Sequence, residues 1–252
     1  GLRKFFCTNG TKLDTLKDDI FKYTVDLLTM SLDGATAEMN NQIRVGADFD
    51  TVTQNLKAIV DEKKTRGIQL PYMSIVMTLM QSNFRQFPQY VQLAHDLGLE
   101  ECKGVYLTVF EERLMSECMY NLREEVGAVF EQAVALGEKL GVNVKLPYLQ
   151  GDDIAGEKEH KDCYVGWRDF FLGSDGYVRS CMSTSKKLFH VSKYKTFDEM
   201  WNSLEYQEFR AQVNSADMAM PCRNCYQASF ANWNRKSAFV QVGNEFAPIW
   251  EK

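Results

Sequence analysis

Several features that would assign a chain to a common functional class are absent from this sequence of 252 residues. No apolar run approaches the roughly 18 residues that a membrane-spanning helix needs. The net charge of −5 argues against a nucleic-acid partner held through its phosphates. Gly/Ser-rich linkers, low-complexity segments and repeats of solenoid length are also absent. What remains is ordinary globular composition, 45% hydrophobic and 25% charged, sufficient for one large or two modest domains.

Histidine is scarce, and no secretion signal is visible. The three histidines, His95, His160 and His190, are scattered, and no spacing between them indicates a metal site or a general base. Because there is no signal peptide and the cysteine count of seven is odd, disulfides are disfavoured. We therefore expect a cytoplasmic protein with no membrane partner and no nucleic-acid partner.

Cysteines are concentrated in the last third of the chain. Four of them lie there: Cys163, Cys181, Cys222 and Cys225. The pattern FFLGSDGYVRSC predicts a β-hairpin, because Asp175-Gly176 supplies the positive-φ pair of a tight two-residue turn. Antiparallel pairing would bring Cys163, before the first strand, close to Cys181 at the end of the second. Cys222 and Cys225 form a CxxC turn, and thiolates so arranged suit zinc or an iron–sulfur cluster.

Spacing alone leaves zinc and iron–sulfur as open alternatives, and buried structural thiols are a third interpretation. Zinc ribbons usually have two CxxC knuckles, whereas this chain has one. Cys7, Cys102 and Cys118 match no ligand position, and we expect them to be buried thiols. Between the two cysteine pairs, Thr196-Phe-Asp-Glu199 is a capping-box signature. It predicts one helix whose apolar face carries Phe197, Met200, Trp201, Leu204, Phe209 and Val213.

The first part of the chain alternates between apolar, strand-like runs and segments with helical periodicity. Strands are predicted at residues 4–8, 26–33, 72–80, 104–110 and 142–146, and helices at 13–23, 49–64, 87–98 and 122–140. This alternation predicts an α/β fold in which helices cover a parallel sheet. Ligands would lie at the carboxyl ends of the strands. Polar residues there, notably Asn9, Ser31 and Asp33, are candidate ligand contacts, although Asn-Gly and Asp-Gly pairs are also common turn chemistry.

Two groups of motifs resemble one enzyme family. Thr8-Asn9-Gly10, Ser31-Leu-Asp-Gly34 and Gly46-Ala-Asp-Phe49 resemble the middle of the barrel of radical S-adenosylmethionine (radical SAM) enzymes. The last third, from Cys163 through Gly176-Tyr-Val-Arg-Ser-Cys181 to Cys222-Arg-Asn-Cys225, resembles the auxiliary-cluster domain called SPASM, or its shorter form, twitch. The resemblance implies a partial parallel (β/α) radical SAM barrel at residues 1–147 and a small α+β SPASM/twitch-like domain at residues 148–252.

Two motifs of that family do not occur in this sequence: the CxxxCxxC loop, which holds the [4Fe–4S] cluster that binds S-adenosylmethionine, and the glycine-rich GGEP-like segment. The resemblance places both upstream of Gly1. The chain is therefore expected to be the C-terminal portion of a longer enzyme and to be inactive as given, with a degenerate homologue as the alternative. The strands present would be too few to close a barrel, which would leave an exposed edge prone to aggregation.

The resemblance implies two cofactor sites. The four cysteines of the last third would hold one auxiliary [4Fe–4S] cluster, because no cysteine follows Cys225 to build a second. Four thiolate ligands favour electron transfer over substrate anchoring. Ser31 would contact the ribose of S-adenosylmethionine and Arg44 would pair with its carboxylate, with Asn9 and Asp33 at the same strand ends.

The function implied by the resemblance is that of a radical SAM enzyme, in which a 5′-deoxyadenosyl radical abstracts hydrogen from a peptide, protein or small-molecule substrate. Such an enzyme would take electrons from a donor such as flavodoxin or ferredoxin. The rival interpretation is a non-catalytic module, in which the four cysteines bind zinc or an iron–sulfur cluster and the first part of the chain is a scaffold.

Overall fold

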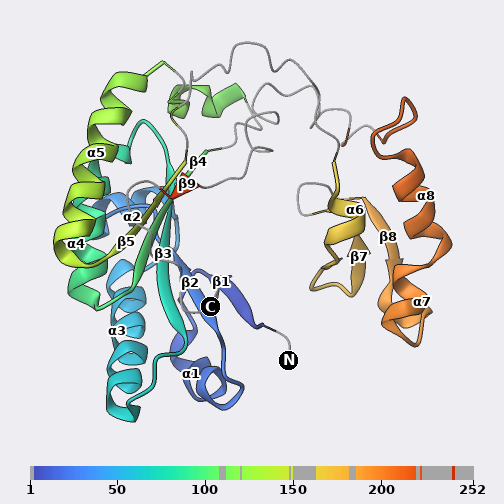
Figure 1. Cartoon of the computed structure of the whole chain (residues 1–252), viewed down its shortest axis with the longest axis horizontal. Coiled ribbons are helices and arrows are strands. Elements are labelled where there is room, and N and C mark those ends of the chain that lie inside the picture. The colour runs from blue at the N-terminus through green and yellow to red at the C-terminus, as the bar shows by residue number, and fades with distance from the viewer. Residues whose placement is uncertain are drawn as a thin grey trace. The chain divides into compact units, whose positions relative to one another are not determined.

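The computed structural model describes residues 3–107, 112–119, 121–147, 149, 163–181, 186–219, 222, 240 and 241. The chain divides into two compact units. The first contains Gly1–Asp153 together with Ser237–Lys252, and the second contains Ile154–Lys236. Figure 1 shows the elements of both units, coloured by residue number.

The first unit is built on a sheet with the strand order β1-β2-β3-β4-β5-β9. These strands are β1 (Phe5–Thr8), β2 (Leu27–Ser31), β3 (Tyr72–Leu79), β4 (Glu101–Tyr106), β5 (Asn143–Leu146) and β9 (Val240–Gln241). The first five run parallel, and β9 pairs antiparallel with β5. The predicted fold class, a parallel (β/α) unit followed by a small α+β unit, is confirmed. Among the described strands β1 lies at one end of the order, where Phe5 is 74% exposed.

Helices connect the strands of this unit. They are α1 (Leu13–Lys22), α2 (Ala37–Ile43), α3 (Phe49–Arg66), α4 (Phe87–Leu97) and α5 (Arg123–Leu140), with short 3₁₀ turns η1 (Phe84–Gln86) and η2 (Glu112–Glu117). Figure 1 shows α3, α4 and α5 along one face of the sheet. The sequence pattern predicts all of these α-helices except α2. That helix has only 7 residues and a largely polar sequence, AEMNNQI, so it has no apolar stripe to detect.

The two faces of the sheet differ in polarity, because side chains alternate along a strand. One face packs on the helices: a Cβ placed on Gly104 would lie 3.2 Å from Phe87 of α4. The other face carries polar side chains, and the hydroxyl oxygens of Thr29 and Ser74 lie 2.6 Å apart on it. Glu101 belongs to this polar face. Strand β4 begins at Glu101, three residues before the predicted start at residue 104. The sequence pattern missed these residues because the first half of the strand lacks a continuous apolar run.

The second unit combines a small antiparallel sheet with short helices. Its elements are α6 (Val165–Arg168), β6 (Phe171–Leu172), β7 (Tyr177–Arg179), β8 (Lys187–His190), the 3₁₀ turn η3 (Val191–Lys193), α7 (Phe197–Trp201) and α8 (Leu204–Gln212). Its core consists of Val178, Phe189, Tyr206, Phe209 and Val213.

In both units, no helix of the described residues has the length and apolar character of a membrane span.

The predicted hairpin is present, but its turn differs from the prediction. Strands β6 and β7 pair antiparallel. The Gly176 N–H donates to the Gly173 carbonyl at 3.0 Å, and the Gly173 N–H donates to the Tyr177 carbonyl at 2.9 Å. These bonds enclose a three-residue loop in which Gly176 alone has a positive φ, +77°. The prediction of a two-residue turn with a positive-φ pair is wrong, because Ser174 is part of the loop and Asp175 keeps a negative φ.

The single helix predicted after residue 196 is two helices. The capping box at Thr196 and Glu199 is present and opens α7. The helix ends at Trp201, and Ser203 then caps α8 by accepting a hydrogen bond from the Tyr206 N–H. This second N-cap restarts the helical phase, so Tyr206 is fully buried while Leu204 is 66% exposed. The predicted apolar face is therefore wrong at Leu204. It is also wrong at Phe197, which is 53% exposed.

Candidate functional site

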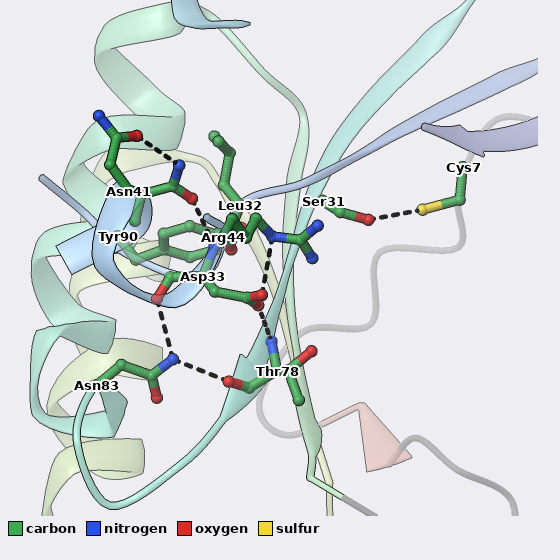
Figure 2. A network of polar contacts seen from close by, with 10 residues as sticks. Cys7, Ser31, Leu32, Asp33, Asn41, Arg44, Thr78, Asn83 and Tyr90 are labelled. Atoms are coloured by element: carbon green, nitrogen blue, oxygen red, sulfur yellow. Dashed lines mark hydrogen bonds and ion pairs between the residues drawn. The ribbon is translucent and has the colours of Figure 1, made fainter. Parts of the chain in front are cut away.

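The turn after β2 is centred on the carboxylate of Asp33. One oxygen, Oδ2, lies 2.8 Å from Nε of Arg44 in an ion pair. The other, Oδ1, accepts a hydrogen bond of 2.7 Å from the backbone N–H of Thr78 on β3. The Asp33 side chain is 7% exposed and that of Arg44 28% exposed. Figure 2 shows this carboxylate between the Arg44 guanidinium and the Thr78 nitrogen.

The backbone around Asp33 is held by buried side chains from neighbouring elements. Asn40 of α2 accepts a hydrogen bond from the Asp33 N–H at 2.9 Å. The Asn83 amide donates to the Asp33 carbonyl at 3.0 Å, and the Tyr90 hydroxyl of α4 donates to the Leu32 carbonyl at 3.0 Å. All three of these polar side chains are 0% exposed. The turn is therefore a fixed part of the fold, in agreement with the requirement that buried polar groups be hydrogen-bonded.

Glycine is needed directly after Asp33. A Cβ at Gly34 would lie 2.6 Å from the backbone nitrogen of Asn40, which is closer than real Cβ contacts. The close approach lets α2 begin immediately beyond the turn. Arg44 is the C-cap residue of α2, and its backbone N–H donates to the Asn40 carbonyl. The short helix missed by the sequence pattern is thus the element that delivers Arg44 to the strand ends.

Ser31 lies at the end of β2, next to Cys7 on β1. The Ser31 oxygen and the Cys7 sulfur are 3.2 Å apart. In Figure 2 the outer nitrogens of Arg44 lie on the side of the guanidinium that faces Ser31. A hydroxyl and a guanidinium therefore occupy the carboxyl ends of the parallel strands, where ligands of such sheets bind.

Asn9 has a structural task in the turn from β1 to α1. Its side-chain oxygen accepts hydrogen bonds from the Thr11 N–H at 3.2 Å and from the Thr11 hydroxyl at 3.0 Å. Gly10 follows with a φ of +76°. The arrangement is an Asx-type turn. The cofactor-binding role assigned to Asn9 from the sequence stays a prediction.

Three of the four predicted metal ligands lie in the described part of the second unit. The backbone N–H of Cys163 donates to the Asn214 side chain at 2.8 Å, and Asn214 donates back to the Cys163 carbonyl at 3.1 Å. Cys163 and Cys222 both pack against the core of this unit. Cys181 directly follows Ser180, which is fully buried beside β7. These half-buried thiols fit the donor chemistry of a thiolate-ligated metal.

The complete four-cysteine site stays a prediction. Cys225, with the neighbouring residues 220, 221, 223 and 224, lies outside the described residues. Among the residues that are described, no group of three or more His, Cys, Asp or Glu side chains is gathered closely enough to hold a metal. The structure nevertheless assigns Cys163, Cys181 and Cys222 to the same compact unit.

The remaining cysteines differ in burial. Cys102 is fully buried, as predicted, and burial followed by the negative charge of Glu101 raises the pKa of its thiol. Cys118 is half-buried and Cys7 is exposed. The prediction that Cys7 is a buried thiol is wrong, because β1 lies at the end of the strand order and has less cover than the central strands.

Sequence reasoning missed a charged cluster on the polar face of β4 and β5. Glu101 is 0% exposed, and its carboxylate lies 2.8 Å from Nζ of Lys103 and 3.2 Å from Nζ of Lys145. The Asn143 amide donates to it at 2.8 Å. Burial and this carboxylate also raise the pKa of Tyr72. The alternations Glu-Cys-Lys and Asn-Val-Lys were the available signal, because each puts two polar residues on one strand face.

Comparisons with known proteins bear on both units. Residues 163–226 match the SPASM family, an iron–sulfur cluster-binding domain. The chain is 22% identical over 256 residues to the tungsten-containing aldehyde ferredoxin oxidoreductase cofactor-modifying protein of Pyrococcus furiosus. That alignment covers 94% of this chain and 69% of the relative.

The fold is similar to that of SuiB from Streptococcus suis. The structure of SuiB bound to S-adenosylmethionine matches with a TM-score of 0.59 at 12% identity, over 92% of this chain and 56% of SuiB. The structure bound to the precursor peptide SuiA matches with a TM-score of 0.60 at 10% identity, over 96% of this chain and 58% of SuiB. The chain thus spans little more than half of SuiB. These findings confirm the resemblance to radical SAM enzymes that carry a C-terminal SPASM domain.

Proposed function

We propose that this chain, a partial (β/α) unit followed by a SPASM iron–sulfur domain, is the C-terminal portion of a radical SAM enzyme that modifies a peptide or protein. Residues 1–147 would belong to the barrel and residues 148–252 to a SPASM domain of the shorter, twitch type. The match at residues 163–226 carries the proposal, because it spans all four cysteines. The missing CxxxCxxC motif would be supplied by the rest of the enzyme.

At the strand ends, the chain's own residues would bind and orient S-adenosylmethionine. The Ser31 hydroxyl would hydrogen-bond the ribose, and the outer edge of the Arg44 guanidinium would pair with the carboxylate. Bound beside a reduced [4Fe–4S] cluster, S-adenosylmethionine would supply the radical chemistry that removes hydrogen from the substrate. The two side chains would hold S-adenosylmethionine in one orientation. Holding a reactant close to its reactive geometry lowers the activation barrier.

In the second unit, Cys163, Cys181, Cys222 and Cys225 would hold one auxiliary [4Fe–4S] cluster that transfers electrons. Packing of Cys163 and Cys222 against the apolar core supports this role, because exclusion of water around a cluster affects its reduction potential. The binding of SuiB to a precursor peptide favours a polypeptide substrate. The Pyrococcus relative, by contrast, is a cofactor-modifying protein by name. An electron donor such as flavodoxin or ferredoxin, and a cytoplasmic location, complete the proposal.

The proposal is tested by 5′-deoxyadenosine formation in the full-length protein, reduced anaerobically and analysed by liquid chromatography and mass spectrometry. We expect cleavage of S-adenosylmethionine, and we expect Arg44→Met to raise the Kd for S-adenosylmethionine by about tenfold or more, since a charge-assisted pair to the carboxylate is lost. Arg66→Met is the matched control, because Arg66 pairs with Glu62 at the far end of α3. Absence of 5′-deoxyadenosine, or unchanged affinity in the Arg44 variant, would count against the assignment.

A further inference from the structure

We propose that Asp33 is a positioning residue: it fixes the guanidinium of Arg44 so that the outer edge of this group faces the carboxylate of S-adenosylmethionine. The inference rests on the function proposed above. It changes the role of Asp33 from a ligand contact, as the sequence predicts, to a residue that acts through Arg44.

The first argument is the geometry of the ion pair. Asp33 Oδ2 lies 2.8 Å from Nε of Arg44, on the inner edge of the guanidinium. The contact is an ion pair without hydrogen-bond geometry, because Nε has no hydrogen-bond partner. The charge attraction still holds the inner edge of the planar guanidinium against Asp33, which leaves the two outer nitrogens on the opposite edge. Figure 2 shows those nitrogens on the side that faces Ser31. The outer edge is the one that pairs with a carboxylate through two parallel hydrogen bonds.

The second argument is that the Asp33 carboxylate is itself immobile. Its other oxygen accepts a hydrogen bond of 2.7 Å from the Thr78 N–H. The Asp33 backbone is hydrogen-bonded to the buried side-chain amides of Asn40 and Asn83. The Asp33 side chain is 7% exposed, so its attraction to Arg44 is weakly screened by water. A surface arginine loses rotamer freedom when it binds a ligand, and this fixed partner removes part of that cost in advance.

The third argument excludes direct contact with the ligand carboxylate. Both Asp33 oxygens already have partners, and a second carboxylate approaching them would be repelled. Arg44 lies between these two negative charges in the proposed complex. Asp33 therefore favours the ligand only through the direction of the guanidinium.

The test measures how tightly two ligands bind to the full-length protein at equilibrium under anaerobic conditions. The ligands are S-adenosylmethionine and its decarboxylated form, which lacks the carboxylate that Arg44 would hold. In Asp33→Asn the amide oxygen can still accept the Thr78 N–H, so the turn is preserved. We expect this variant to raise the Kd for S-adenosylmethionine about tenfold and to leave the Kd for the decarboxylated ligand within about twofold. The double variant with Arg44→Met should bind no more weakly than Arg44→Met alone.

Each other outcome has a definite meaning. Equal weakening of both ligands, or multiplied effects in the double variant, would overturn the positioning role. If Arg44→Met weakens binding and Asp33→Asn does not, the inference fails while the proposed function stands. If Arg44→Met itself has no effect, the proposed Arg44–carboxylate contact fails first.

If the Asp33→Asn variant does not fold, the Arg44→Lys variant replaces it in the test, because lysine keeps the positive charge but lacks Nε. Wild-type affinity in that variant would overturn the proposal.

Discussion

Replacing Cys222 with alanine in the full-length protein should abolish product formation while 5′-deoxyadenosine is still made from S-adenosylmethionine. The reason is that cleavage of S-adenosylmethionine and electron transfer use residues of different units. Ser31 and Arg44 belong to the first unit, and the four proposed cluster ligands belong to the second. Loss of one thiolate should also remove about four iron atoms per chain, since a cluster is lost as a whole. Cys181→Ala should behave in the same way. Both products and the iron content are measured on one sample.

The same variants should destabilise the second unit, because metal binding contributes folding free energy when the ligands come from distant parts of the sequence. The matched control is Cys118→Ala, a half-buried cysteine outside that unit, for which we expect unchanged iron content and unchanged product. Normal product yield in the Cys222 and Cys181 variants would show that the site is structural only and that the electron-transfer role is wrong.

Glu101→Ala should be among the most destabilising single substitutions in the first unit. The carboxylate is 0% exposed and is shared by Lys103, Lys145 and Asn143. Removing one partner of a buried charge pair typically costs about 3–5 kcal/mol, because a buried charge loses its compensation. We expect a loss of this size in the free energy of unfolding, measured by urea denaturation followed by far-ultraviolet circular dichroism.

A matched control for Glu101 is available on α3. Asp61 pairs with Lys57 at 2.9 Å, but both side chains are about half exposed, at 54% and 50%. Asp61→Ala should therefore change the free energy of unfolding by about 0.5 kcal/mol or less. Similar effects of the two substitutions would mean that the Glu101 cluster is solvated, contrary to its burial.

The parts of the fold that could be predicted from the sequence are those with strong local patterns. β3 has a nearly continuous apolar run, and α3 and α5 have regular apolar spacing with a glycine at the end, so their existence needs no long-range information. The hairpin and the capping box at Thr196 were readable for the same reason. Boundaries were less certain where a strand face is polar, as at the start of β4.

The parts that could not be predicted depend on contacts between distant residues. Whether Asp33 faces a ligand or Arg44 is decided by α2, a helix without an apolar stripe, and by Thr78, which is 45 residues away in sequence. The Glu101 cluster depends on the register of β4 against β5, which alternation alone does not fix. The break after Trp201 is signalled only by Ser203, whose capping role competes with a continuous apolar pattern.

The identity of the metal tests the account most directly. Chain 1–252, purified anaerobically, is analysed for iron, acid-labile sulfide and zinc by mass spectrometry and colorimetry. The account predicts about four iron and four sulfide per chain and a brown protein with broad absorption near about 400 nm, as expected for one thiolate-ligated [4Fe–4S] cluster. A colourless protein with about one zinc per chain and no iron would contradict it, because zinc supplies no electron transfer and would make the four cysteines a structural site.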